Sequence, residues 1–151
     1  MKKLNILIPQ YNEYEIDISP LLDSISIQQN VDFDEIGVII CNDGSEYILS
    51  DNFLESYPFE IQYFKEPHRG VSATRNFLLD KSDAEYVMFC DADDMFYNAC
   101  GLWILFREFE NGDFDTLLSV FVEETRDAAG NVMYINHEVD TTFVHGKVHR
   151  K

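Results

Sequence analysis

Short apolar runs alternate with segments of helical periodicity along the first ninety residues of the chain. Residues 4–8, Leu-Asn-Ile-Leu-Ile, and residues 36–41, Ile-Gly-Val-Ile-Ile-Cys, are typical of buried strands. Between them, residues 20–27 carry apolar positions at helical spacing, with Ser19 as a candidate N-cap and Pro20 at the first helical position. The beginning of the chain therefore predicts a strand, a helix and a second strand.

The same alternation continues up to residue 90. The pattern predicts four further elements, namely a weak helix at 47–56, a short strand at 61–64, a helix at about 71–79 and a strand at 86–90. Strands that alternate with helices in this way form a mainly parallel sheet with right-handed crossovers. We therefore expect an α/β fold with helices flanking the sheet.

The last third of the chain has a different pattern. Residues 98–109 have helical spacing with a broad apolar face. Residues 116–125 and 132–137 alternate as strands do, and the Gly130-Asn131 pair between them predicts the turn of a C-terminal β-hairpin. We expect the helix and the hairpin to close one side of a binding crevice, within a single domain that spans residues 1–151.

Composition and charge narrow the classes of function. With 151 residues, 46% apolar and 14% aromatic, the chain is about one globular domain long. The net charge of −17, with only 11 Lys and Arg residues, argues against nucleic acid as a partner. No apolar run reaches the roughly 20 residues needed to span a bilayer, and the first run is too short for a signal peptide. The three cysteines, Cys41, Cys90 and Cys100, lack metal-type spacing, so we expect reduced thiols and a cytoplasmic protein.

The acidic run Asp91-Ala92-Asp93-Asp94 follows the apolar run at 86–90 and is the most informative motif. In the sequence, the nearest basic residues are Lys81 and Arg107. Carboxylates crowded at the carboxyl end of a strand face a binding crevice, and their oxygens suit Mg²⁺ or Mn²⁺ bridged to a phosphorylated ligand. The alternative is a solvated turn, in which Asp is common.

A second polar cluster, Pro9-Gln10-Tyr11-Asn12-Glu13, follows the first strand directly. Proline has no N–H to donate, so we expect Pro9 to end the strand. The aromatic and amide side chains that come next could line a pocket for a planar base. Taken alone, this cluster is more typical of an ordinary loop.

The third cluster, Asn42-Asp43-Gly44-Ser45, follows the second strand. Asp43 could accept a hydrogen bond from a ring N–H such as N3–H of uracil, while Gly44 permits the tight turn that exposes it. The alternative is a plain turn in which Ser45 caps the next helix.

The fourth cluster places Arg69-Gly70 before a helix whose early turns hold Arg75 and Asn76. Helix N-termini favour anions, and an arginine can hold a phosphate with two hydrogen bonds, so Arg75 is a candidate for a diphosphate or ribose contact. The alternative is a surface arginine paired with one of the many acidic residues.

The order of these four motifs resembles the family 2 glycosyltransferases, which bind nucleotide-sugar donors on the Rossmann-like GT-A fold. The resemblance runs from Leu4 to Asp94 and rests on Pro-x-Tyr-Asn-Glu, Asp-Gly-Ser, Gly-Val-Ser-x-x-Arg-Asn and Asp-Ala-Asp-Asp. It implies an inverting, metal-dependent transfer of a sugar, with UDP-sugar as the expected donor and a glycan or other hydroxyl compound as acceptor. The residues that it assigns to the nucleotide are Pro9, Tyr11, Glu13, Asp43, Arg75, Asp91 and Asp93, and those that it assigns to Mn²⁺ or Mg²⁺ are Asp91, Asp93 and Asp94.

The chain departs from the family pattern in two places. Asn42 stands where the family often has the first of two acids, which removes one base or ribose contact. Inverting members carry their general base in a Glu-Asp motif well after the acidic cluster, and no such pair occurs there, so we expect the base beyond Lys151 and the domain to be incomplete at its C-terminus. The late acids are Glu123, Glu124 and Asp140, and the late histidines His145 and His149, all of which we interpret as solvated residues.

Three other interpretations were weighed against this one. A Mg²⁺-dependent phosphoacceptor receiver domain requires an acidic pair after the first strand, and a haloacid-dehalogenase-type phosphatase requires its Asp-x-Asp there, so position disfavours both. A non-catalytic nucleotide-sugar-binding module stays open. The resemblance is also compatible with peripheral membrane association of a longer protein, and the oligomeric state stays open.

Overall fold

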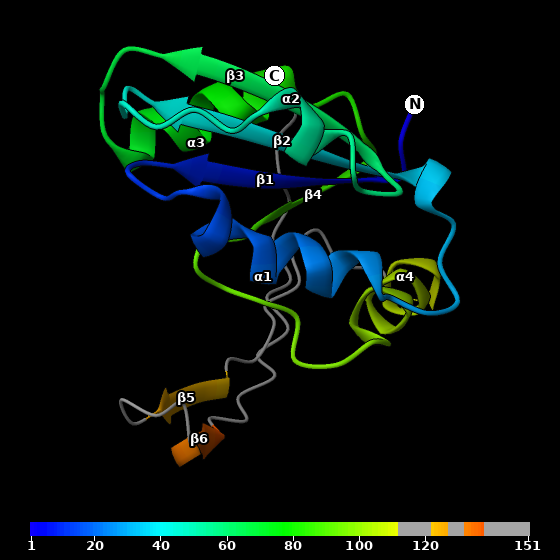
Figure 1. Ribbon diagram of the computed structural model, residues 1–151. Helices are drawn as coiled ribbons and strands as arrows, with labels where there is room; N and C mark the ends of the chain where they lie inside the picture. Colours follow the sequence, from blue (N-terminus) through cyan, green and yellow to red (C-terminus); the bar gives the residue numbers. More distant parts are fainter. Residues whose placement is uncertain (112–121, 127–131, 138–151) are drawn as a thin grey trace. The chain divides into compact units, whose positions relative to one another are not determined.

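The computed structural model describes residues 1–111, 122–126 and 132–137 (Figure 1). The chain divides into two compact units, Met1–Trp103 and Ile104–Lys151. The first unit contains a four-stranded parallel sheet and the second contains a two-stranded antiparallel sheet. The expectation of one domain over residues 1–151 stays a prediction.

The parallel sheet consists of β1 (Leu4–Gln10), β2 (Ile36–Asp43), β3 (Glu60–Glu66) and β4 (Tyr86–Phe89). Its strand order is β3-β2-β1-β4, and every neighbouring pair is parallel. This arrangement confirms the predicted α/β class with a mainly parallel sheet. It also brings the carboxyl ends of all four strands to one edge.

The two central strands are buried on both faces. Every residue of β2 is buried, and in β1 only Pro9 is partly exposed. A strand covered on both faces needs a continuous apolar run rather than an alternating one, which explains why these two runs were visible in the sequence. On one face, Leu7 and Ile39 pack with Leu78 in a core cluster.

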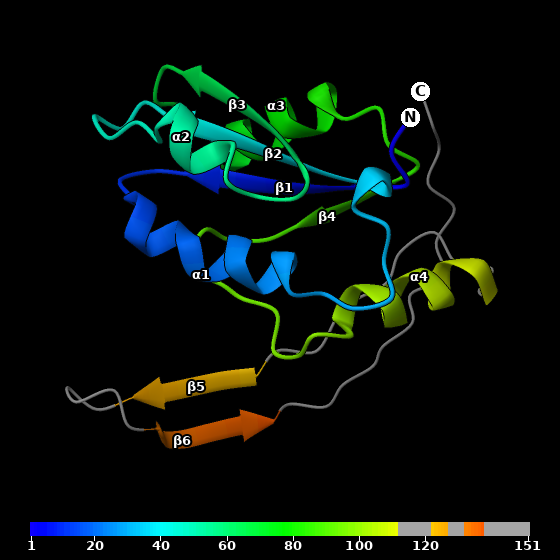
Figure 2. The same cartoon turned by 45° about the vertical axis from the view of Figure 1, so that its right-hand side comes forward.

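Helices cover both faces of this sheet. Figures 1 and 2 show α1 (Glu15–Ser26) on one face and α3 (Val71–Lys81) on the other. The residues of α1 that are buried are Ile18, Leu21, Leu22, Ser24 and Ile25. A 3-10 helix, η1 (Phe33–Glu35), precedes β2, and the short helix α2 (Asp51–Leu54) precedes β3.

Helix α1 begins five residues earlier than the sequence predicted, so the assignment of Ser19 as N-cap was wrong. Its N-cap is Tyr14, whose backbone N–H donates to Asp17 Oδ2 at 2.9 Å. Pro20 consequently lies inside the helix, where it cannot donate to the carbonyl of Ile16. Ile16 is 78% exposed, so water can reach the region of this carbonyl. Acidic side chains in the first turn favour the earlier start, because they complement the helix dipole.

The prediction that Pro9 ends the first strand was also wrong. β1 continues to Gln10, with Pro9 aligned to Cys41. The carbonyl of Leu7 accepts from Cys90 N at 3.1 Å, and Pro9, two residues further, faces the same side. The ladder between β1 and β4 ends at Leu7. An N–H at position 9 would therefore have no acceptor in β4, and proline breaks no strand hydrogen bond there.

The other elements occur where the sequence predicted them, with shifted ends. α2 covers only four residues of the predicted helix at 47–56, and its N-cap is Ser50, whose Oγ accepts from Phe53 N at 3.3 Å. Strand β3 extends beyond the predicted residues 61–64 at both ends, and α3 extends two residues beyond Leu79.

Helix α4 (Gly101–Asn111) and the strands β5 (Val122–Arg126) and β6 (Val132–His137) follow the acidic cluster. The pairing of β5 with β6 is antiparallel, with a register irregularity at Thr125 and Arg126, which confirms the predicted hairpin. The turn at 130–131 and residues 116–121, 140, 145 and 149 lie outside the described residues. The closure of a crevice by α4 and the hairpin stays a prediction.

None of the described helices is long and apolar enough to cross a membrane. The three cysteines are free, as predicted, with Cys41 and Cys90 buried and Cys100 partly exposed.

Candidate functional site

The polar clusters that follow three of the parallel strands, together with the beginning of α3, line one pocket of about 430 Å³ at the carboxyl edge of the sheet. All seven residues that the sequence assigned to the nucleotide line it, and Asp94 is absent from its lining. Gln10 also lines it, as an amide of the cluster after the first strand, and sequence reasoning missed the other four lining residues, which are His68, Val71, Thr74 and Ala92. Each of them lies within or beside one of the four polar clusters of the sequence. Only this closeness along the sequence, and not the residue type, could have indicated that they line the pocket.

A second pocket, also of about 430 Å³, lies at the opposite edge of the sheet, around Lys2, Asn5, Gly37 and Glu60. These residues lie at or near the amino ends of the strands. Ligands of open parallel sheets bind outside the carboxyl ends, so the first pocket is the candidate functional site.

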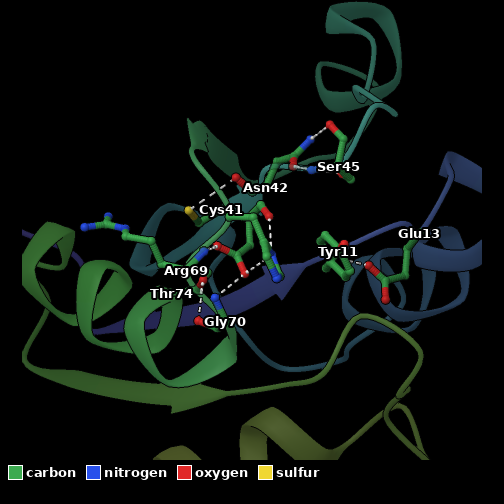
Figure 3. Close-up of polar contacts among 10 residues, drawn as sticks. Tyr11, Glu13, Cys41, Asn42, Ser45, Arg69, Gly70 and Thr74 are labelled. Carbon is green, nitrogen blue, oxygen red and sulfur yellow. Dashed lines mark hydrogen bonds and ion pairs between the residues drawn. The ribbon is translucent and has the colours of Figure 1, made fainter.

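Asp43 ends β2, and its side chain accepts hydrogen bonds from the loop before α3, of which Figure 3 labels Arg69 and Gly70. Its Oδ1 accepts from Arg69 N at 2.8 Å, and its Oδ2 accepts from Gly70 N at 2.8 Å and lies 3.0 Å from His68 Nδ1. Burial by itself raises the pKa of this carboxyl group, but these two N–H groups, the Thr74 hydroxyl and the charge of His68 outweigh burial and lower the pKa. The ionised side chain of Asp43 therefore stabilises this loop through hydrogen bonds. Its contact with a base stays a prediction.

Gly44 is required by the close approach of the same loop. Its φ is +79°, and a Cβ at this position would lie 2.5 Å from the backbone nitrogen of His68. Only glycine combines the left-handed conformation with this space, as the predicted tight turn after Asp43 requires.

Asn42, the departure from the family's two acids, faces away from the pocket. Its buried side chain donates to Tyr47 O at 2.8 Å, and its Oδ1 accepts from Ser45 N at 2.7 Å (Figure 3). A carboxylate could not donate to the Tyr47 carbonyl, so this hydrogen bond requires the amide of asparagine at position 42. Ser45 bonds Asn42 and does not cap α2, contrary to the alternative weighed from the sequence.

The loop after β1 is braced by Glu13 and Gln10. Tyr11 N donates to Glu13 Oε2 at 2.5 Å, Gln10 Nε2 donates to Glu13 O at 2.7 Å, and Asn12 adopts a φ of 70°. The Tyr11 ring stacks on His68, with ring centroids 4.4 Å apart and an interplanar angle of 27°. Tyr11 of this loop therefore lines the pocket, and the binding of a planar base there stays a prediction.

Arg75 supplies a cation to the acidic cluster that sequence distance concealed. Its Nη2 lies 2.5 Å from Asp91 Oδ1, and its guanidinium lies 5.9 Å from the centre of the Phe89 ring. Arg75 is therefore closer to the cluster in space than Lys81 and Arg107 suggest from their positions in the sequence. Arg75 lines the pocket and pairs with an acid, as the alternative interpretation expected, and its contact with a diphosphate or ribose stays a prediction.

The acidic cluster keeps an excess of negative charge despite Arg75. Burial, followed by the charges of Asp91 and Asp93, raises the pKa of Asp94 above its usual value, although the backbone N–H of Asp91 lowers it. Burial, together with Asp94 and Asp91, also raises the pKa of Cys90 to about 12. Carboxylate oxygens with excess charge fit a hard divalent cation. Among the described residues, however, no three candidate ligands converge closely enough to hold a metal ion.

The segment after the acidic cluster is fixed by two buried polar residues that sequence reasoning missed, Ser24 in α1 and Gln28 just after it. Ser24 Oγ accepts from Phe96 N at 2.9 Å. Gln28 Oε1 accepts from Leu102 N at 2.9 Å, and its Nε2 donates to Asn98 O at 2.8 Å. The only signal in the sequence was one polar residue, Ser24, among the apolar positions of the helix and a second, Gln28, just after its end.

Comparison with known proteins identifies the class. The sequence matches glycosyl transferase family 2 over residues 5–146, so the chain belongs to this family. Glycosyltransferase GlyA of Streptococcus pneumoniae serotype 4 is 30% identical over 146 residues, which cover 95% of this chain and 18% of GlyA. The minor teichoic acid biosynthesis protein GgaB of Bacillus subtilis strain 168 is 33% identical over 94 residues, which cover 60% of this chain and 10% of GgaB.

Solved structures agree with this family. The crystal structure of S. aureus TarS 1–349 has a TM-score of 0.64 and 25% identity, with 74% of this chain and 33% of that chain covered. The same protein in complex with UDP has a TM-score of 0.63 and 25% identity. The chain thus spans 18% or less of the two curated relatives named above.

Proposed function

We propose that the chain forms the donor-binding part of an inverting, metal-dependent glycosyltransferase that uses a UDP-sugar and transfers its sugar to a glycan or other hydroxyl acceptor. The observation that carries this proposal is the pocket of about 430 Å³, which collects all seven residues assigned to the nucleotide at one edge of the sheet. Membership of glycosyl transferase family 2 supports the reaction class. The structure of TarS with UDP supports the choice of uridine nucleotide.

In this proposal the pocket divides between the two ends of the nucleotide. The aromatic face of Tyr11, beside Asp43, receives the base. Arg75 and the acidic cluster receive the ribose and diphosphate, where the guanidinium attracts phosphate oxygens and carboxylates accept from ribose hydroxyl groups.

In this proposal Asp91, Asp93 and Asp94 would supply ligands to a divalent cation together with the bound nucleotide, because no three candidate ligands among the described residues converge on a metal site by themselves. When bound, Mn²⁺ or Mg²⁺ would neutralise diphosphate charge and would take its remaining ligands from the diphosphate and water. The raised pKa of Asp94 is consistent with this proposal, because a cation beside the cluster would stabilise the ionised carboxylate. Arg75 is directed to Asp91, which leaves Asp93 as the carboxylate that most needs a partner from outside the protein.

Titration calorimetry with UDP tests the binding part of the proposal. We expect binding with Mn²⁺ present and much weaker binding with EDTA, because the bridge between carboxylates and diphosphate is lost. Asp93→Ala should remove most of the metal-dependent part. Asp80→Ala, which removes an exposed acid on α3 far from the pocket lining, is the matched control and should bind as the parent does. Equal UDP affinity with Mn²⁺ and with EDTA would contradict the metal role.

A non-catalytic nucleotide-sugar-binding module remains the second candidate function, because binding and transfer use different groups. The general base of an inverting transfer typically contributes about 10² to 10⁴ in rate, and no such base is assigned in the described pocket. Transfer of radiolabelled sugar from a UDP-sugar to a hydroxyl acceptor separates the two. Transfer above the rate of donor hydrolysis supports the enzyme, whereas tight UDP binding without transfer supports the module.

A further inference from the structure

The acidic cluster lies in a loop that little packing holds in place. The loop runs from the end of β4 to the beginning of α4. Among residues 91–97, Ala92 is buried and Phe96 is partly buried, whereas all three acids are exposed. Segments with few buried contacts open locally at a low cost in free energy. The position of the carboxylates therefore depends on hydrogen bonds between this loop and the rest of the protein.

Two backbone hydrogen bonds anchor the acidic segment to different elements. On one side, Cys90 N donates to the carbonyl of Leu7 in β1 at 3.1 Å. On the other side, Phe96 N donates to Ser24 Oγ in α1 at 2.9 Å. Within the described chain, the bond to Ser24 is the only one from the backbone of residues 91–97 to another element. The three acids lie between these anchors, so the hydroxyl of Ser24 fixes one end of the segment that carries them.

The Ser24 hydroxyl is oriented by its own helix. Its Oγ donates to Leu21 O at 2.7 Å, so its hydrogen is directed back along α1 and a lone pair stays available to Phe96 N. Ser24 is only 3% exposed and is the one polar residue among the buried residues of α1. Serine favours a helix less than alanine does, so helix formation gives no reason for a hydroxyl at this place. The contact with the acidic loop does give one.

We propose that Ser24 is a positioning residue for donor binding, whose hydroxyl holds the acidic loop in the conformation in which Asp91 and Asp93 meet the diphosphate and its cation. This inference rests on the proposed function. A loop anchored at both ends is ordered before the nucleotide arrives, and a preorganised site binds more tightly than one that binding has to order. Loss of the hydroxyl releases one end of the segment, so the nucleotide would then have to order it.

Two serines of α1 form a matched pair for the test. Ser26 Oγ donates to Asp23 O at 2.8 Å, which is the same bond to the third preceding residue that Ser24 makes to Leu21. Ser26 is partly exposed, and in the described part of the chain it accepts no hydrogen bond from another segment. Ser24→Ala therefore removes the helix bond and the bond to Phe96, whereas Ser26→Ala removes a helix bond alone. Ser24→Thr keeps a hydroxyl at the same position.

Amide hydrogen exchange followed by NMR tests the anchor without any ligand. The Phe96 amide should be protected in the parent and in Ser26→Ala, because its N–H has an acceptor in both. In Ser24→Ala this protection should be lost while the amides of the buried strand β2 stay protected, and Ser24→Thr should recover part of it. A Phe96 amide that is equally protected in Ser24→Ala and in the parent would overturn the inference.

Titration calorimetry with UDP separates positioning from a purely structural role. With Mn²⁺ present, Ser24→Ala should weaken UDP binding by about 5- to 30-fold, which corresponds to ordering the backbone of one further residue on binding. With EDTA the difference from the parent should largely disappear, because no cation then joins the loop to the diphosphate. Ser26→Ala should bind as the parent does under both conditions. A purely structural role would lower the urea midpoint of Ser24→Ala and leave the UDP affinity of the folded protein unchanged.

Two binding results would contradict the inference. One is a Ser24→Ala protein that loses the protection of the Phe96 amide but binds UDP with Mn²⁺ as tightly as the parent, since the bond then serves stability alone. The other is an equal loss of affinity in Ser26→Ala, since the helix bond would then explain the effect. Failure of the parent itself to bind UDP is a different outcome, which refutes the proposed function, and the exchange of the Phe96 amide still decides whether Ser24 anchors the loop.

Discussion

Gln28→Leu tests how the acidic cluster is held in place. Gln28 lies just beyond the C-terminus of α1, is 6% exposed, and reaches across to the segment that leads from the cluster into α4. Its Oε1 accepts from Leu102 N, one of the first-turn N–H groups of α4 that have no partner within the helix. Its Nε2 donates to the carbonyl of Asn98. Leucine has a similar volume and can make neither bond.

The expected loss of stability follows from these two bonds. Loss of a side-chain cap at a helix N-terminus costs about 1 kcal/mol. Leaving a partly buried carbonyl such as that of Asn98 without its partner adds about 1–3 kcal/mol. We therefore expect Gln28→Leu to lower the free energy of unfolding by roughly 2–4 kcal/mol, which is a large part of the stability of a typical small domain.

Urea unfolding followed by fluorescence suits this measurement, because the only tryptophan of the chain, Trp103, follows Leu102 directly in α4. The matched control is Gln29→Leu, the neighbouring and exposed glutamine, whose backbone N–H bond to Ala99 O survives the change. The control should stay within about 0.5 kcal/mol of the parent. A Gln28→Leu protein as stable as Gln29→Leu would refute the reasoning, because it would mean that neither bond contributes.

The remaining predictions concern the helix proline, the brace of the pocket and the thiols. Pro20→Ala should raise the free energy of unfolding by about 1–3 kcal/mol in urea titrations, because an exposed alanine restores an N–H inside α1; an unchanged midpoint would contradict this. The pKa of Asp43 is lowered in the folded state, so its stabilisation is present above the ordinary carboxyl pKa of about 4 and is lost as the pH falls through the lower folded value. Asp43→Asn should therefore be less stable at pH 7 and should show a flatter acid limb of stability against pH, and parallel limbs would argue against the brace. Burial raises the pKa of Cys41 to about 11 and of Cys90 to about 12, so a thiol reagent at pH 7.5 should label chiefly Cys100 in the native protein and all three cysteines in urea, as mass spectrometry can count.

The sequence located individual elements and motifs, but it did not always reveal where an element begins or what role a residue has. The runs at 4–8 and 36–41 were recognised as strands because burial on both faces demands unbroken apolar runs. Helix α1 was misjudged, since a proline inside a helix is rare enough that Pro20 suggested a beginning. The helix begins instead where the backbone N–H of Tyr14 donates to the Asp17 carboxylate, a contact that only the backbone conformation reveals.

The roles of the pocket residues divide in the same way. Chain order alone placed Tyr11, Asp43 and the acidic cluster at strand ends, and the carboxyl ends of parallel strands always meet at one edge. The contact between His68 and Asp43 could not be predicted, because it depends on a loop that returns 25 residues later to the end of β2.

The sequence by itself determined the α/β class, the parallel sheet and the family, because periodicity and motif order are local properties of the chain. Only the tertiary structure decided which charges and polar groups meet. Arg75 reaches Asp91 from 16 residues away, and Gln28 caps a helix 74 residues later. No characteristic spacing in the sequence marks such pairs. The distance between their atoms is set by how the strands and helices pack and not by their separation along the chain.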